Sequence, residues 1–273
     1  MQTAVIRPSK MSAPYFRTGL VSISFRNWSP EELIDRVLEA GQSGVEWGGD
    51  VHVPHGDTVR ALQVGQLTRD AGLTVVAYGS YYRAAETENN PDFHAVLDSA
   101  LALGAPTIRV WAGRRGSAIA DEAYRNAVKN DLARICALAE TQNIRVALEY
   151  HGGTLTDHPD SARELLESLR CPNLDSLWQP PNGQTFEYCL ASLEDLLPRV
   201  SHVHVFHWGK GGGDRFPLED GAERWKVYLS RLAFPGQSRW ALLEFVKGDD
   251  PDQYLQDALT LGRWVHDLTP EDA

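Results

Sequence analysis

The feature that most constrains the fold is a unit that recurs along this 273-residue chain: a short apolar stretch, a loop and an amphipathic helix. Continuous apolar stretches bounded by turn residues are typical of strands buried on both faces of a parallel sheet. The predicted strands cover residues 17–25, 44–47, 73–78, 107–111, 144–149, 174–179, 200–207 and 239–246. The predicted helices cover residues 30–40, 58–71, 91–103, 121–142, 160–169, 185–197, 222–232 and 251–268.

Strands and helices that alternate in this way predict an α/β protein with a (β/α)8 TIM barrel, a fold that typically needs about 250 residues. No long linker or shift in composition marks a second domain. Residues 15–269 are therefore predicted to form one barrel, with a flexible tail at 1–14, a short tail at 270–273 and an aromatic loop at 79–82. A doubly wound open sheet would predict a GxGxxG turn after the first strand, where this sequence reads SISFRNWSP.

Net charge, cysteine spacing and the lack of long apolar stretches limit which binding partners and which cell compartment we expect. The formal net charge is −11, and a surface this acidic repels phosphate backbones, so no nucleic-acid partner is expected. The three cysteines form no CxxC pair and no disulfide framework, which favours a reducing compartment. Neither a secretory signal nor a stretch as long as a membrane span is evident, so we expect a cytoplasmic protein without membrane contact. Assembly into homo-oligomers is left open.

The segment IRVALEYHGG carries the first candidate for chemistry. Its apolar run leads into Glu149, and strand alternation puts Glu149 and His151 on the same face. A carboxylate at the end of a buried strand is costly unless a cation or hydrogen-bond donors meet it. The alternative is a strand-end glutamate that simply reaches water, and the other strand ends must decide between the two.

Active sites of (β/α)8 barrels lie where the strands meet their following loops. Four consecutive strands end in polar side chains whose inward directions converge on one point, namely Glu149, Gln179, His204 and Glu244. Carboxylates, an amide oxygen and an imidazole suit a divalent ion such as Mn, Mg or Co, with Zn as a further option. Without a cation the two carboxylates would repel each other, and one would have to stay protonated.

Other polar residues near strand ends have two interpretations each. Glu46 either orients another side chain or contacts substrate, and His202 alone is more typical of a structural histidine. The glycine-rich run 209–213 is either a flexible hinge or a lid. The predicted substrate-binding residues among these are Glu46, Trp111, His151, His207, Lys210 and Arg215. Trp111 could instead fill the core, and Lys210 or Arg215 could be a solvated loop charge.

At these positions the sequence resembles the xylose-isomerase-like superfamily, which includes sugar isomerases, ketose epimerases and sugar phosphate isomerase/epimerase-like proteins. The resemblance extends from Tyr15 to about Leu268 and is carried by GVEWGGD, VALEYHGGTLTD, LWQPPNG, HVHVFHW and LLEF. It implies a single divalent metal held by Glu149, Gln179, His204 and Glu244. Gln179 departs from the usual aspartate, which should weaken metal binding. The resemblance also places Asn182 at the substrate, where many epimerases have a histidine, and His207 stands where an aspartate is common.

The resemblance implies a metal-dependent isomerase or epimerase of carbohydrate metabolism. Glu149 or Glu244 would remove a proton next to the carbonyl of a sugar or sugar phosphate, giving an ene-diolate, and the other would return it. A metal-dependent lyase, such as a dehydratase of a sugar or inositol derivative, is the alternative on the same scaffold. A nuclease for abasic DNA would need more metal ligands and a basic face, and a non-catalytic binding role would follow if Gln179 abolished metal binding.

Overall fold

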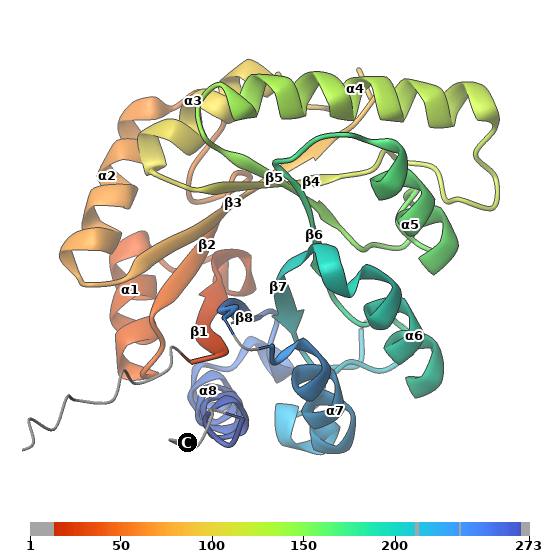
Figure 1. Cartoon of the computed structure of the whole chain (residues 1–273). Coiled ribbons are helices and arrows are strands. Elements are labelled where there is room, and N and C mark those ends of the chain that lie inside the picture. Colours follow the sequence, from red (N-terminus) through yellow and green to blue (C-terminus); the bar gives the residue numbers. More distant parts are fainter. Residues whose placement is uncertain (1–13, 211–212, 235, 269–273) are drawn as a thin grey trace, which may run out of the picture.

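The computed structural model describes residues 14–210, 213–234 and 236–268, so the predicted tails lie almost wholly outside the described residues. Parallel strands form a closed barrel in chain order, in which β1 pairs with both β2 and β8 (Figure 1). This confirms the predicted single-domain (β/α)8 barrel. The strands are β1 (Phe16–Val21), β2 (Gly44–Gly48), β3 (Thr74–Arg83), β4 (Thr107–Trp111), β5 (Arg145–Glu149), β6 (Leu174–Trp178), β7 (Val200–Val205) and β8 (Arg239–Leu243).

Helices surround the barrel and cover the outer face of its strands (Figure 1). For most of them, the residue just before the first turn caps the helix with its side chain. Ser29 accepts a hydrogen bond from Glu32 N at 3.2 Å, and Asp121 accepts one from Tyr124 N at 2.8 Å. The helices are α1 (Pro30–Glu39), α2 (Thr58–Asp70), α3 (Phe93–Leu103), α4 (Glu122–Glu140), α5 (Pro159–Ser168), α6 (Phe186–Leu196), α7 (Ala222–Leu232) and α8 (Pro251–His266).

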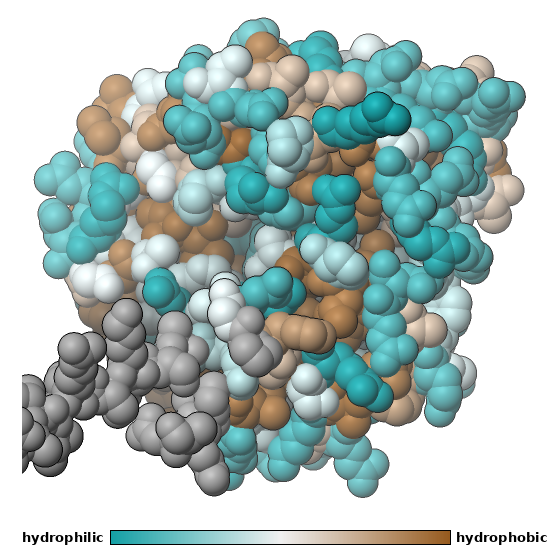
Figure 2. Space-filling model, viewed as in Figure 1, coloured by the Kyte–Doolittle hydropathy of each residue, from teal (hydrophilic) through white to brown (hydrophobic). Residues whose placement is uncertain are grey.

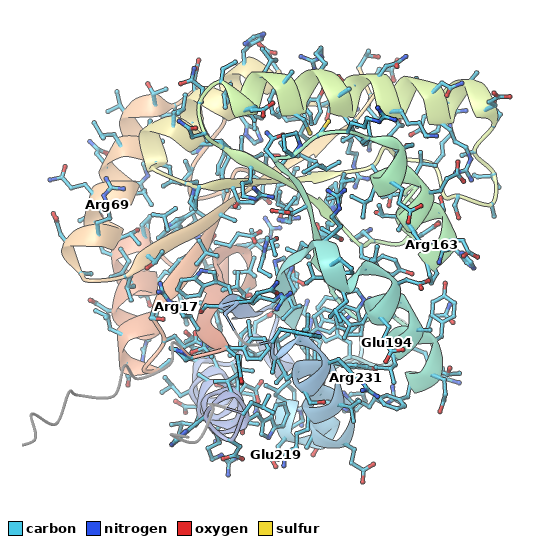
Figure 3. All side chains as sticks on the ribbon, viewed as in Figure 1. Arg17, Arg69, Arg163, Glu194, Glu219 and Arg231 are labelled. Carbon is cyan, nitrogen blue, oxygen red and sulfur yellow. The ribbon has the colours of Figure 1, made fainter. Side chains whose placement is uncertain are left out.

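The helix surface that faces away from the strands is polar. Figure 2 shows hydrophilic side chains over much of the outer rim, with apolar side chains between them. Ion pairs link neighbouring helices there, as between Glu194 on α6 and Arg231 on α7 at 3.3 Å, both labelled in Figure 3. No helix in the described part of the chain combines the length and apolar character needed to cross a membrane.

Two local predictions in the first three strands were wrong, and the last two strands end at Val205 and Leu243, earlier than predicted. Residues 22–25 form a 3-10 turn rather than the end of the first strand, because the hydroxyls of Ser22 and Ser24 accept hydrogen bonds from Gly48 N (2.8 Å) and Phe245 N (2.9 Å). Residues 79–82 continue β3 rather than forming a loop. The register slips between Gly79 and Tyr82, and this bulge lets the aromatic segment stay in the sheet.

The interior of the barrel contains both apolar and ionisable side chains. Val21, Val76 and Leu242 belong to a small apolar cluster separate from the main core between strands and helices. Five ionisable residues inside the barrel are at most 3% exposed: Glu46, Arg109, Glu149, His202 and His204. Groups of this kind are stable in a protein interior only when they are paired.

A buried carboxyl on α8 makes stability depend on pH. Asp257 accepts hydrogen bonds from Leu218 N (2.9 Å) and Gln253 Nε2 (2.8 Å), but burial raises its pKa. The native state then binds more protons than the unfolded state, so this group lowers stability as the pH rises above its unfolded pKa. We expect Asp257→Asn to gain stability relative to wild type between pH 4 and pH 7, measured by urea unfolding. The exposed control Asp98→Asn should show no such trend, and an equal trend in both variants would contradict the prediction.

Candidate active site

Three of the four predicted ligands line one cavity at the carboxyl ends of the strands. The cavity has a volume of about 520 Å³. Glu149 ends β5, while Gln179 and Glu244 follow β6 and β8 directly. All three are nearly buried, with exposed fractions of 3%, 8% and 6%. The closed barrel therefore brings together side chains as far apart in the sequence as Glu149 and Glu244, which are separated by 95 positions.

Arg109, in the middle of β4, is a buried cation that lines this cavity. Its Nε lies 2.7 Å from Glu46 Oε1, and its Nη1 pairs with Glu149 Oε2. Burial by itself would lower the pKa of Arg109, but Glu149 and Glu46 outweigh this effect and hold the pKa well above its usual value. The guanidinium thus neutralises part of the negative charge of the carboxylates, which the sequence led us to expect a metal ion alone to balance.

Sequence reasoning missed Arg109 because it considered only polar residues at strand ends. The available signal was an arginine inside the short apolar strand TIRVW. An arginine in the middle of a strand buried on both faces must have an anionic partner, because an unpaired buried charge is very costly. Such a residue would have pointed to a carboxylate on an adjacent strand.

Gly79 makes room for this arginine. A Cβ at Gly79 would lie 2.6 Å from Arg109 Nη2 and 2.9 Å from Glu46 Oε1. Because two ion pairs hold Arg109, it cannot move aside freely. We expect Gly79→Ala to destabilise the protein by about 1–3 kcal/mol in thermal unfolding, the usual cost of overpacking. Gly152→Ala, where nothing lies within 4 Å of the added Cβ, is the control and should unfold like wild type.

Glu149 is surrounded by hydrogen-bond donors. Besides Arg109, Trp111 Nε1 donates to its Oε2 at 2.5 Å, and Gln179 Nε2 donates to its Oε1 at 2.8 Å. Burial would raise the pKa of Glu149, but Arg109, followed by His151 and His204, lowers it. Glu149 is therefore held as an anion in a fixed orientation.

His204 lies between two carboxylates. Its Nε2 is 3.1 Å from Glu46 Oε2, and its Nδ1 is 3.4 Å from Glu244 Oε1. Burial would lower the pKa of His204, but Glu244 and Glu46 outweigh burial and raise the pKa to about 10. For Glu46, burial is likewise outweighed, here by Arg109 and His204, so its pKa lies well below the usual value.

A metal ion fits this arrangement at His204 Nδ1. That buried atom makes no hydrogen bond within the described residues, while Nε2 faces Glu46. A histidine that binds metal through one nitrogen and is oriented by a carboxylate at the other is the usual arrangement in metal sites. Glu149, Gln179 and Glu244 supply oxygen atoms on the side of the cavity, and Glu46 fits the orienting role rather than substrate contact.

A second set of residues could also hold an ion. Candidate ligand atoms of Glu46, His202 and His204 lie within 4.8 Å of one another, and all three residues are buried. Glu46 is already engaged, with Arg109 on Oε1 and His204 on Oε2. None of these three residues lines the cavity of Glu149 and Glu244, whereas three of the four residues of the other donor set do. The first set, His204 Nδ1 with the oxygen atoms of Glu149, Gln179 and Glu244, is therefore better placed to hold an ion that acts on a bound substrate.

The predicted substrate-binding residues fall into three groups. Trp111, His151 and Asn182 line the cavity of Glu149 and Glu244. His207 and Lys210 line a neighbouring cavity, which Asn182 shares. Arg215 lies apart from both, because its guanidinium pairs with Asp249 at 2.5 Å.

Comparison with known proteins identifies the family. The chain matches the xylose isomerase-like TIM barrel family over residues 34–264. It belongs to this family. A 3-dehydroshikimate dehydratase of Bacillus anthracis is 27% identical over 206 residues, which are 68% of this chain and 70% of the relative.

Solved structures of the family share the fold. A Bacillus anthracis structure, the probable 3-DHS dehydratase AsbF involved in petrobactin synthesis, aligns with a TM-score of 0.74 and 22% identity over 90% of this chain and 98% of that one. A xylose isomerase-like protein from Mycobacterium smegmatis in complex with magnesium aligns with a TM-score of 0.69 and 14% identity, covering 93% and 98%. Both likenesses concern the fold.

Proposed function

We propose that this protein is a metal-assisted dehydratase that removes a proton next to the carbonyl group of a small hydroxylated substrate and then expels a neighbouring hydroxyl as water. The observation that carries the proposal is the asymmetry of the two carboxylates in the cavity. Glu149 accepts hydrogen bonds from three side chains, Arg109, Trp111 and Gln179. Glu244 has one ionic contact among the described residues, with His204 Nδ1 at 3.4 Å.

This asymmetry favours a single acid–base group. A carboxylate that three donors stabilise as an anion is a poor proton acceptor, because hydrogen bonds to the charged form lower its basicity. Glu244 lacks these donors and lines the open cavity, so we assign it the role of the base. Dehydration needs only one such group, since the proton taken from carbon can be returned to the leaving hydroxyl. Epimerisation by two opposed bases needs a second one.

The residues divide the work as follows. When bound by Glu149, Gln179, His204 and Glu244, a divalent ion supplies positive charge at the carbonyl oxygen of the substrate. Glu244 takes the proton from the adjacent carbon, whose electron pair forms the C=C bond of an enolate. The enolate then reforms the carbonyl, the C–O bond to the β-hydroxyl breaks, and the hydroxyl leaves as water with the proton from Glu244. Arg109 keeps Glu149 ionised, and Trp111 fixes its orientation.

Similarity to a relative supports the choice of reaction. The 27%-identical relative is a 3-dehydroshikimate dehydratase, which makes dehydration the first reaction to test. The magnesium complex of the Mycobacterium smegmatis structure makes magnesium the first ion to test. The replacement of the usual aspartate by Gln179 makes weak binding of that ion the expectation, with Arg109 supplying part of the positive charge.

A sugar isomerase or epimerase is the second candidate. Its support is the pair of carboxylates at the ends of β5 and β8, strands that only β6 and β7 separate in the closed barrel. In this mechanism Glu149 would return the proton to carbon, so its ion pair with Arg109 would have to break during the reaction.

One experiment separates the candidates. The protein, loaded with Mg²⁺ or Mn²⁺, is incubated in D₂O with 3-dehydroshikimate and with a panel of ketoses, and NMR and ultraviolet absorbance are followed together. A dehydratase gives a conjugated product with rising absorbance. An epimerase or isomerase puts deuterium on carbon in the recovered sugar without such a product. If neither signal appears with metal bound, both candidates are wrong.

A further inference from the structure

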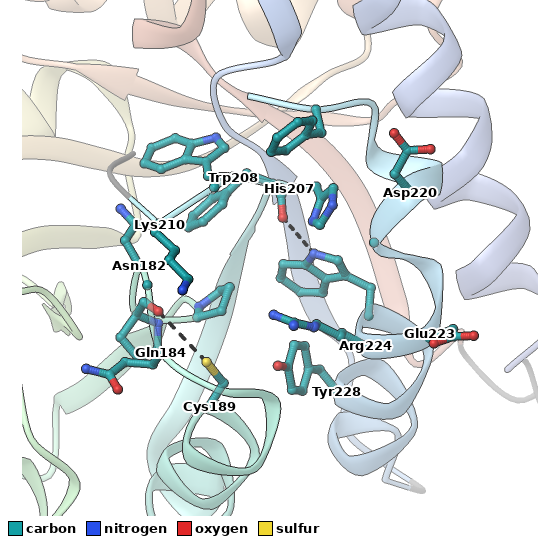
Figure 4. Close-up of a pocket in the computed structure, with 18 residues that line it drawn as sticks. Asn182, Gln184, Cys189, His207, Trp208, Lys210, Asp220, Glu223, Arg224 and Tyr228 are labelled. Atoms are coloured by element: carbon teal, nitrogen blue, oxygen red, sulfur yellow. Dashed lines mark hydrogen bonds between the residues drawn. The ribbon is translucent and has the colours of Figure 1, made fainter. Parts of the chain in front are cut away.

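A second cavity, of about 380 Å³, lies beside the candidate active site. It is formed by the loops after β6 and β7 and by the first turns of α7 (Figure 4). Asn182, Phe206 and Trp208 line both cavities, so the two form neighbouring parts of one cleft. The loops approach closely at Gly183, where φ is +75° and an added Cβ would lie 2.9 Å from Lys210 O.

Two cations face this cavity without a counter-ion. Lys210 and Arg224 extend toward its centre from opposite sides, while the carboxylates of Asp220 and Glu223 point away from it (Figure 4). Neither Lys210 nor Arg224 takes part in an ion pair among the described residues, although most other arginines that line cavities here do. Both side chains are exposed, so water screens their mutual repulsion, and an anion in the cavity would be attracted by both charges.

The Tyr228 hydroxyl provides an independent indication of a ligand. Tyr228 is 1% exposed and lines the same cavity, and its hydroxyl makes no hydrogen bond within the described residues. Its polar neighbour is the thiol of Cys189, which is only a weak hydrogen-bonding group. A buried hydroxyl without a partner is costly, and such groups usually receive a partner from a ligand or an ordered water.

We propose that this second cavity binds an oxyanion, a phosphoryl or carboxylate group, through Lys210, Arg224 and the Tyr228 hydroxyl. Charged donors bind such groups strongly, and a tyrosine hydroxyl can donate to the same oxygens. Because the cavity adjoins the site of Glu149 and Glu244, the oxyanion is the non-reacting end of a substrate whose carbonyl end lies in that site. The placement of the substrate rests on the proposed function, whereas the binding of an oxyanion does not.

Anion binding can be measured without catalysis. The chelator-treated full-length protein is titrated by calorimetry with inorganic phosphate and, separately, with acetate. Arg224→Gln should weaken binding of the preferred anion at least tenfold, and Tyr228→Phe should weaken it several-fold with little change in packing. Lys226→Gln is the matched control, because Lys226 is an exposed cation on the same helix outside the cavity, and it should bind like wild type. Tighter binding of phosphate assigns a phosphoryl group, and tighter binding of acetate assigns a carboxylate.

Two results would overturn the proposal: no heat of binding for either anion up to about 20 mM, or equal affinity in wild type and Arg224→Gln. The test is also separate from the proposed reaction. Glu244→Gln should bind the anion as tightly as wild type does, because Glu244 does not line this cavity. A negative dehydratase assay would therefore not contradict the proposed anion site. Absence of anion binding would likewise not contradict the proposed dehydration.

Discussion

Arg109→Met is expected to destabilise the protein by about 3–5 kcal/mol, the usual cost of removing one partner of a buried ion pair. The substitution leaves Glu46 and Glu149, with exposed fractions of 0% and 3%, without their guanidinium. Methionine keeps most of the side-chain volume, so a cavity does not account for the loss. For a chain of this size, the thermal midpoint should fall by roughly 10 °C. Measurements with a chelator present exclude compensation by a bound metal.

The pH dependence distinguishes loss of charge pairing from loss of packing. In wild type, Arg109 is a main reason that the pKa values of Glu46 and Glu149 are lowered despite burial, so their contribution to stability is lost as the pH falls. In Arg109→Met, burial raises these pKa values above the unfolded ones, and the contribution reverses. The stability difference between wild type and variant should therefore shrink from pH 7 to pH 5. A constant difference would mean that packing alone is responsible.

The control is an exposed ion pair. Arg36→Met removes a contact of 2.9 Å with Glu39, and the two side chains are 37% and 51% exposed. Such pairs contribute less than about 1 kcal/mol, because water solvates and screens both charges. If Arg36→Met and Arg109→Met destabilise equally, the buried network does not have the role assigned to it.

The fold was predictable because each of its elements has a local signature. Apolar strands, of five or six residues except for the ten-residue β3, alternate with capped helices, and a Pro or an acidic N-cap begins most helices. The errors occurred where side chains of distant segments decide the local structure. Ser22 and Ser24 bind the backbones of β2 and of the segment after β8, contacts separated by 26 and 221 residues, and no local pattern indicates them.

The candidate site was only partly predictable. Strand-end position brings Glu149, Gln179 and Glu244 to one cavity, as the alternation of buried strands implied. The sequence did not indicate that Gln179 would hydrogen-bond Glu149, nor that Arg215 would turn away to pair with Asp249. Side-chain pairing across the barrel depends on register, and one residue of slip reverses which side chains point inward. Arg109 is paired with Gly79 on β3 and with Ala147 on β5, and these two small residues leave room for its side chain.

Glu244→Gln is expected to lower kcat by about 10²–10⁴-fold, the usual contribution of a positioned general base. Glutamine keeps the shape and an acceptor oxygen but cannot take up a proton, so exchange of the substrate proton with D₂O should be lost to the same extent. Glu140→Gln, an exposed change at the end of α4, is the control and should keep full activity. Glu149→Gln should also weaken metal binding and raise the metal concentration needed for half-maximal activity, but unlike Glu244→Gln it should keep proton exchange when metal is saturating. If Glu244→Gln turns over normally while Glu149→Gln abolishes proton exchange with metal saturating, Glu149 is the base, and the argument for dehydration from its three hydrogen-bond donors fails.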